Sequence, residues 1–240
     1  MILYIYGIID SNTRIDEPIR GLEGERIYNI SLMDIGIVAS NFKGIIKDIT
    51  KAHVLVHEDV LERLMKQFTV LPFRFRTLFN KEEDVLSLIR GSYIDVRGNL
   101  NRLQNKAEFG VKVIWSGDRI KEQIERDLCK REYNLHGLSD LPEKLFIERK
   151  FEKYKIDKEY GEKADICIAI VDNFFNRFAA EKKIEKLKSK DLLLNAFYLV
   201  ENGKQGDFKK AFEHLKIAPV DFKYLFSGPW PPYNFVNIKI

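Results

Sequence analysis

The chain has 240 residues, of which 45% are hydrophobic and 32% are charged, and its 40 basic and 36 acidic side chains leave a net charge of +4. This composition is typical of a folded globular protein with one large or two ordinary domains, and it excludes a disordered chain. No apolar run approaches the roughly 20 residues of a membrane-spanning helix, and the balanced charge argues against nucleic-acid binding. We therefore expect a cytoplasmic protein that meets neither lipid membranes nor nucleic acid.

The N-terminal part of the chain alternates between β-rich runs and amphipathic helical patterns. Apolar residues at helical spacing, such as Val60, Leu61 and Leu64, predict a helix over residues 54–68. A similar spacing from Val85 to Leu103 predicts one long amphipathic helix despite its internal glycines. The β-rich runs predict strands at residues 2–9, 26–31, 36–42 and 70–75.

A second series of elements begins after residue 104. Phe109, Val111 and Val113 occupy alternate positions in KAEFGVKVIW and predict a strand that ends at Trp115. Residues 118–163 carry 12 basic and 12 acidic side chains, which indicates long, solvated helices with a break at LSDLP. The remaining predicted elements are a helix with an apolar face over residues 167–178, strands at 192–200 and 222–226, and a short helix at 207–215.

Both series approach the split βαβ plan of ferredoxin-like domains. We therefore predict an α+β fold with two ferredoxin-like (split βαβ) domains and a C-terminal Pro/aromatic tail. The predicted N-terminal domain covers residues 1–104, and the predicted C-terminal domain, with its long charged helices, covers residues 105–227. The tail, residues 228–240, is expected to pack on the body of the protein.

The tail begins with GPWPPYNFV, which has no counterpart elsewhere in the chain. Its prolines fix φ near −65° and remove backbone donors, so the segment cannot form a helix interior or a central strand. Its aromatic rings could serve as a ligand for a partner, in polyproline II form, or as a clamp on the chain's own body. If these rings were exposed together, they would form an apolar surface patch that promotes association, so we predict that the tail is a clamp. The tail residues behind this prediction are Gly228, Pro229, Trp230, Pro231, Pro232 and Tyr233.

His53 and His57 stand four residues apart, a spacing that would place both rings on one helix face, as a zinc site requires. The HExxH pattern is absent, and a third ligand would have to come from Glu58 or from elsewhere in the chain. The alternative is an ordinary pair of histidines at a helix start. Cys129 and Cys167 lack metal-finger spacing, and the chain has no phosphate-cradling glycine loop or nucleophile elbow. We therefore predict no metal, cofactor or catalytic residue.

The stretch TVLPFRFRTLF, residues 69–79, interleaves aromatic and basic side chains. In a strand, Phe73 and Phe75 would point to one face and Arg74 and Arg76 to the other. Exposed rings among arginines on a ferredoxin-like sheet are typical of an RNA-binding module, in which the rings stack on bases. The alternative is that the phenylalanines belong to the core and the arginines pair with nearby carboxylates. The missing RNA-recognition signature and the near-neutral charge favour this alternative.

Three blocks of the chain together resemble the gas vesicle protein F/L family (GvpF/GvpL). They are LYIYGII at residues 3–9, VLPFRFRTLF at residues 70–79 and the tail block GPWPPYNFV. The second block supplies the motif residues Leu71, Pro72, Arg74 and Phe75. The family block commonly runs Leu-Pro-x-Arg-Phe-Gly-Thr, and here Arg76 occupies the glycine position. A glycine suggests a special backbone dihedral angle, so the turn after Phe75 is where this chain departs from the family.

The resemblance implies a non-enzymatic minor component and assembly factor of gas vesicles, the gas-filled protein shells that give prokaryotic cells buoyancy. Its implied partners are the small hydrophobic gas vesicle shell protein (GvpA), which it would bind and keep from aggregating during vesicle nucleation, and other gas vesicle accessory proteins. The implied fold is α+β with two ferredoxin-like domains and a C-terminal extension, without an established cofactor or catalytic residue. The implied location is the cytoplasm and the gas vesicle.

Overall fold

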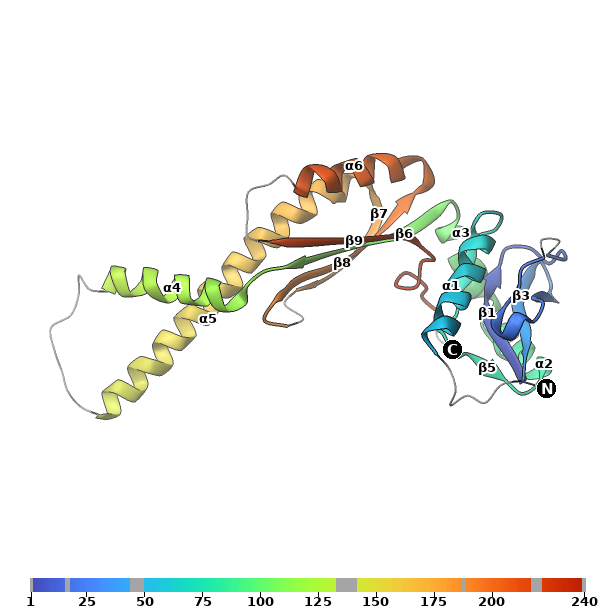
Figure 1. Ribbon diagram of the computed structural model, residues 1–240, viewed down its shortest axis with the longest axis horizontal. Coiled ribbons are helices and arrows are strands. Elements are labelled where there is room, and N and C mark those ends of the chain that lie inside the picture. Colours follow the sequence, from blue (N-terminus) through green and yellow to red (C-terminus); the bar gives the residue numbers. More distant parts are fainter. Residues whose placement is uncertain are drawn as a thin grey trace. The chain divides into compact units, whose positions relative to one another are not determined.

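The computed structural model describes residues 2–15, 18–43, 50–132, 142–186, 189–216 and 222–238, and the chain divides into two compact units. The first unit comprises Met1–Phe109, Leu199–Asn202 and Gly228–Ile240, and the second comprises Gly110–Tyr198 and Gly203–Ser227. The strands form two sheets, and helices accompany each of them (Figure 1).

The first sheet is built around a central strand, β1 (Ile2–Ile9). One edge of β1 pairs antiparallel with β3 (Ile35–Phe42), and the other edge pairs antiparallel with β4 (Val70–Pro72) and β5 (Leu78–Phe79). β2 (Tyr28–Leu32) pairs antiparallel with β3, so the order is β2-β3-β1-β4. Because β1 has neighbours on both sides, every residue after its first is buried, as its apolar sequence predicts.

Helix α1 (Lys51–Met65) covers this sheet with the apolar face that the sequence predicts. Val60, Leu61 and Leu64 are buried in the core with residues of β1 and β3. The 3-10 turn η1 (Leu22–Gly24) lies between β1 and β2, where a complete ferredoxin-like domain has a helix. The first unit is therefore a split βαβ fold in which a short turn stands in the place of the first helix.

The long amphipathic helix predicted over residues 85–103 is interrupted. Helices α2 (Glu82–Gly91) and α3 (Tyr93–Leu103) meet at Ser92, whose φ of −113° and ψ of 16° are not helical. Glycine and serine are weaker helix formers than alanine or leucine, so the break falls where the helix is least stable. The apolar face continues through both helices, and its buried residues are Val85, Ile89, Val96, Leu100 and Leu103.

The second sheet has the same strand order as the first. Among the described residues it contains β6 (Lys106–Ile114), β7 (Ala179–Lys186), β8 (Leu192–Glu201) and β9 (Lys223–Trp230), in the order β7-β8-β6-β9. In both sheets the first strand therefore lies between the third and the fourth, which is the ferredoxin-like order. This confirms the predicted α+β fold with two ferredoxin-like sheets.

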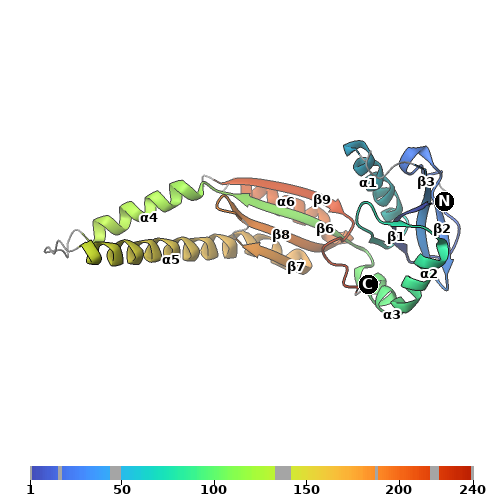
Figure 2. The same ribbon diagram turned by 90° about the horizontal axis from the view of Figure 1, so that it is seen from below.

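Aromatic rings join the second sheet to its helices. These helices are α4 (Gly117–Glu132), α5 (Pro142–Phe175) and α6 (Gln205–Lys216), with the 3-10 turns η3 (Asn176–Phe178) and η4 (Asn202–Lys204). Figure 2 shows α6 behind the strands. The ring of Phe208 on α6 lies 5.5 Å from that of Tyr198 on β8 and 4.9 Å from that of Phe175 on α5. The core of the second unit is thus an aromatic cluster between sheet and helices.

The two edges of the second sheet differ from the sequence prediction. β7 escaped the prediction because its sequence, AAEKKIEK, holds five charged residues and no clear apolar alternation. Charged side chains on an edge strand remain in water and discourage pairing with other chains. β9 at the other edge runs on to Trp230, beyond the predicted end at residue 226. An edge strand tolerates Pro229, since one row of its backbone groups needs no partner in the sheet.

The charged region predicted as paired helices forms α4 and α5. An ion pair of 2.7 Å between Lys121 and Asp157 joins the two helices. The predicted break at LSDLP lies outside the described residues except for Pro142, at which α5 begins. Of the helices in the described ranges, none is both long and apolar enough to span a bilayer.

Candidate functional site

Within the first unit, the C-terminal tail packs against elements that lie far from it in the sequence. Pro231 and Pro232 are buried, and Phe235 keeps only 1% of its surface exposed. Trp230 and Tyr233 are half-buried. The tail is therefore not a free polyproline II ligand, and its rings lie on the chain's own body.

Gly228 provides the entry to the tail. Its φ of 114° lies in the region that favours glycine, and a Cβ there would approach the backbone oxygen of Glu108 to 2.7 Å. The exposed Pro229 follows it in β9. Glycine is thus required at this position by both the backbone angle and the close approach of β6.

The hydroxyl group of Tyr233 connects the tail to α1. It lies 3.1 Å from Nε2 of His57 and donates a hydrogen bond of 3.0 Å to Oε1 of Glu58. The Nδ1 atom of His57 lies 3.0 Å from the hydroxyl of Tyr4 on β1. The histidine is completely buried and stacks on Tyr6, with ring centroids 5.5 Å apart. Both nitrogen atoms of the ring are therefore engaged inside the fold.

The direction of the hydrogen bonds around His57 follows from Tyr233, which has one proton and donates it to Glu58. The backbone N–H of Arg76 donates to the hydroxyl oxygen of Tyr4 at 3.2 Å, so the Tyr4 proton is available for Nδ1 of His57. The Nε2 atom then carries the ring proton and donates to Tyr233, which donates to the acceptor carboxylate of Glu58. A continuous series of hydrogen bonds, here called the relay, thus joins Arg76, Tyr4, His57, Tyr233 and Glu58.

Burial sets the protonation of the relay. Desolvation lowers the pKa of His57 to about 4, so the ring is neutral at neutral pH, as the relay requires. Desolvation raises the pKa of Tyr4 and of Tyr233, which stay protonated as donors. Burial also raises the pKa of Glu58, whereas the hydrogen bond from Tyr233 lowers it. One carboxylate oxygen of Glu58, Oε2, is buried without a hydrogen-bond partner among the described residues.

Two further polar contacts hold the tail. Buried Glu108 on β6 accepts hydrogen bonds from the backbone N–H of Asn234 at 2.8 Å and from its side-chain amide at 2.6 Å. On α3, Asn99 donates to the carbonyl of Asn237 and accepts from its N–H, both at 2.9 Å. Paired bonds of this kind fix the register of the tail as well as its position.

The second motif block lies beside the relay. Leu71 and Pro72 are buried in β4, opposite Ile8 and Gly7 of β1. Phe75 is half-buried, and its ring centroid lies 5.7 Å from that of His57. The structure therefore brings the block together with the tail, although about 150 residues of sequence separate them.

The prediction of a strand through Phe73 and Phe75 is wrong. β4 ends at Pro72, and residues 73–77 form a turn closed by hydrogen bonds from Thr77 to the carbonyl of Arg74. Both phenylalanines are half-buried, and Phe75 packs on the core instead of standing on a sheet surface. The alternating aromatic and basic faces of an RNA-binding strand are therefore not formed.

Arg76 adopts the backbone conformation that its motif position suggests. Its φ is 74°, in the left-handed region that glycine enters freely and arginine does not. The side chain is exposed, and the backbone N–H holds Tyr4 as described above. The chain thus keeps the turn geometry of a glycine with an arginine in its place.

The two histidines of the sequence hypothesis have separate structural roles. Nδ1 of His53 accepts a hydrogen bond of 3.0 Å from the backbone N–H of Thr50 and completes a capping box at the start of α1. His57 belongs to the buried relay. Within the described ranges, no group of three or more histidine, cysteine, aspartate or glutamate side chains could hold a metal ion.

Sequence reasoning missed the acceptors that receive the tail. The sequence indicates Glu58 as a residue of a helix start and a candidate metal ligand, and Glu108 as part of an ordinary strand. The signal for Glu108 is its place in KAEFGVKVI, since a carboxylate amid apolar residues of a central strand needs a buried donor. Nothing local indicates that the donor is Asn234.

Comparison with known proteins gives a consistent result. The sequence profile of the family described as gas vesicle synthesis protein GvpL/GvpF matches residues 2–237. The chain is 26% identical to gas vesicle protein F1 of Halobacterium salinarum over 244 residues, covering 99% of this chain and 94% of that protein. It is 22% identical to gas vesicle protein F of Dolichospermum flosaquae over 244 residues, covering 98% of each.

Two solved structures share the fold. The crystal structure of the gas vesicle protein GvpF from Anabaena sp. PCC7120 superposes with a TM-score of 0.84 at 20% identity, covering 100% of this chain and 99% of that one. The crystal structure of GvpF from Microcystis aeruginosa gives a TM-score of 0.80 at 19% identity, covering 98% and 99%.

Proposed function

Because the chain belongs to the gas vesicle synthesis protein GvpL/GvpF family, we propose that it is a non-enzymatic assembly factor and minor component of gas vesicles. It binds the small hydrophobic shell protein (GvpA) and keeps that protein from aggregating while vesicles nucleate. The observation that carries this proposal is the family match over residues 2–237. Its place of action is the cytoplasm and the growing vesicle, together with other gas vesicle accessory proteins.

The contacts of His57 with Tyr4, Phe75 and Tyr233 support a structural role for the motif residues. His57, the side chain among these best suited to acid–base chemistry, is completely buried and hydrogen-bonded at both nitrogens. A general base must reach the proton that it removes, and this ring has no free nitrogen to offer. We infer that the tail is a clamp that stabilises the first unit, a role supported by the burial of Phe235 in that unit.

Co-expression with the shell protein tests the proposed binding. We expect the shell protein to stay in the supernatant and to co-purify with this chain, whereas it sediments when expressed alone or with an unrelated protein. In cells, removal of the gene is expected to abolish or reduce vesicles in electron micrographs. If the shell protein sediments equally with and without this chain, and vesicles form normally in its absence, the proposal is wrong.

A tail truncation distinguishes a tail that stabilises the chain's own fold from a tail that binds a partner. A chain lacking residues 228–240 is expected to melt at a lower temperature, because Glu108 loses the donors of Asn234 and the core loses Phe235. An unchanged melting temperature together with lost binding of the shell protein would instead identify the tail as a ligand.

A further inference from the structure

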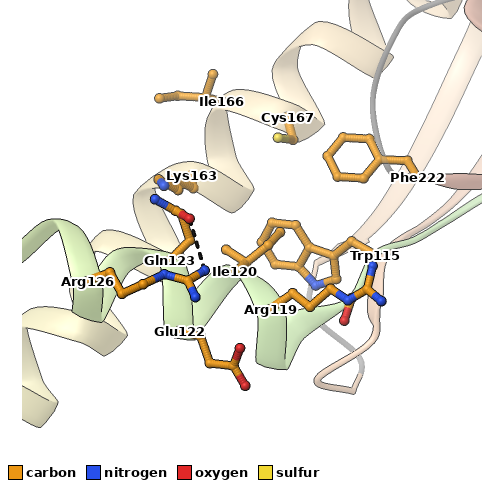
Figure 3. Close-up of a pocket in the computed structure, with 11 residues that line it drawn as sticks. Trp115, Arg119, Ile120, Glu122, Gln123, Arg126, Lys163, Ile166, Cys167 and Phe222 are labelled. Atoms are coloured by element: carbon orange, nitrogen blue, oxygen red, sulfur yellow. Dashed lines mark hydrogen bonds between the residues drawn. The ribbon is translucent and has the colours of Figure 1, made fainter.

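The second unit contains a groove between α4 and α5 that the motif residues do not touch. Figure 3 shows Gln123 of α4 beside Lys163 of α5, with Trp115 and Phe222 at one end of the groove. The ring centroids of these two residues lie 6.3 Å apart. The groove has a volume of about 1060 Å³. It is thus an open channel along two helices, with an aromatic wall at its end.

The helices present matching faces to this groove. The lining residues recur at intervals of three and four, which places them on one face of each helix. On α4 they include Arg119, Glu122, Gln123 and Arg126, and on α5 they include Lys163, Ile166 and Cys167. Ile166 is 61% exposed, and Ile170, one turn further along α5, is 53% exposed. An apolar stripe therefore continues along α5 beyond the groove, without a cover in the described chain.

Positive charge surrounds the apolar part of the groove. Its lining carries the cations Arg119, Arg126 and Lys163 and the carboxylate Glu122. Arg126 donates a hydrogen bond of 3.0 Å to the side-chain oxygen of Gln123. Within the described part of the chain, neither Arg119 nor Lys163 forms a hydrogen bond or an ion pair. Among the described residues, these two cations therefore have no carboxylate that competes with one from a partner.

We propose that this groove binds an amphipathic helix of a partner protein, with its apolar side chains on Ile166, Ile170 and Ile120 and with carboxylates facing Arg119 and Lys163. Two walls with helical spacing suit a third helix, because side chains at intervals of three and four interdigitate along parallel rows. The stripe that continues to Ile170 suits an extended segment more than a compact small molecule. The excess of cations in the lining selects an acidic helix over a basic one.

This inference goes beyond the proposed role towards the shell protein and does not depend on it. The groove lies in the second unit, whereas the second motif block, His57 and the tail belong to the first. Loss of peptide binding would leave the co-sedimentation result untouched, and a negative co-sedimentation result would leave the peptide result untouched.

Fluorescence anisotropy with labelled synthetic peptides tests the proposal on the full chain. The probe is a helical peptide of about 18 residues, or about five turns, with leucine at intervals of three and four and glutamate on the flanking positions. A second peptide replaces every glutamate with lysine. The protein variants are Ile166→Glu and, as a matched control, Ile94→Glu, since Ile94 is 85% exposed on α3 of the first unit. Both changes lie at exposed sites, so circular dichroism is expected to show intact folds.

We expect the acidic peptide to bind, and its affinity to fall at least about tenfold in Ile166→Glu, as for loss of a central apolar contact. Ile94→Glu is expected to bind like the parent chain, and the lysine peptide is expected to bind at least about tenfold more weakly, because of like-charge contacts. No binding of the acidic peptide, equal binding of both peptides, or unchanged affinity in Ile166→Glu would each overturn the proposal. So would binding to vesicles of anionic phospholipid that exceeds binding to the peptide.

Discussion

Replacing Arg76 with glycine should stabilise the protein. Arg76 has a φ of 74°, and an L-residue in the left-handed region is strained by about 1–2 kcal/mol relative to glycine. Glycine also gives the unfolded chain more freedom, which offsets about 0.5–1 kcal/mol of this gain. The backbone N–H that holds Tyr4 is present in either residue. We therefore expect Arg76→Gly to raise the free energy of unfolding by about 0.5–1 kcal/mol.

The measurement is urea unfolding followed by circular dichroism, with a parallel thermal melt. For a chain of this size, about 1 kcal/mol corresponds to a shift of about 2–4 °C in melting temperature. Arg74→Gly is the matched control, because Arg74 is also exposed in the same turn but has no positive φ. There the glycine adds only unfolded-state freedom, so a loss of about 0.5–1 kcal/mol is expected. If both variants lose stability by the same amount, the strain attributed to Arg76 is absent.

Two further predictions concern the relay. Tyr233→Phe should lower the free energy of unfolding by about 1–3 kcal/mol in a urea titration, because it leaves the ring N–H of His57 and the carboxylate of Glu58 without a buried partner. The control is Tyr224→Phe, since the hydroxyl of Tyr224 has no hydrogen bond in the described chain. This variant should stay within about 0.5 kcal/mol of the parent chain. Stability should also fall between pH 6.5 and pH 4, because the unfolded chain takes up a proton on His57 before the folded one does. The loss in the free energy of unfolding is at most about 3 kcal/mol, and the raised pKa of Glu58 opposes it in part. If a His57→Gln chain loses stability as steeply over this pH range, His57 is not the group responsible.

Periodicity was sufficient to predict most of the fold. The spacing of Val60, Leu61 and Leu64 predicted α1, and the apolar run at the start predicted β1, because burial on one face or on both leaves a local pattern in the sequence. β7 leaves no such pattern, because the sequence of an edge strand with many charged side chains resembles that of a loop. The break at Ser92 was hidden because the apolar face continues on both sides of it.

The candidate site was predictable only in its apolar half. Three rings and three prolines in the tail sequence indicate burial, whichever surface receives them. The polar half depends on which buried groups need partners. Tyr4, His57 and Glu58 each look ordinary in their own elements, and only the folded chain places Tyr233 within hydrogen-bond distance of two of them. Hydrogen bonds of this kind join residues that share no local pattern.

The relay gives a physical reason why the turn at Arg76 and the tail occur in one protein. Because Tyr233 gives its proton to Glu58, His57 donates from Nε2 and accepts at Nδ1 from the Tyr4 hydroxyl, whose oxygen also accepts from the backbone N–H of the strained turn. The ring proton then lies on Nε2, where only an acceptor such as Tyr233 satisfies it. Arg76→Gly relieves the strain and keeps this N–H, whereas Tyr233→Phe keeps the turn and removes the acceptor. Opposite changes in stability from these two variants would show that the Tyr233 hydroxyl stabilises the fold, whereas the arginine side chain of the turn does not.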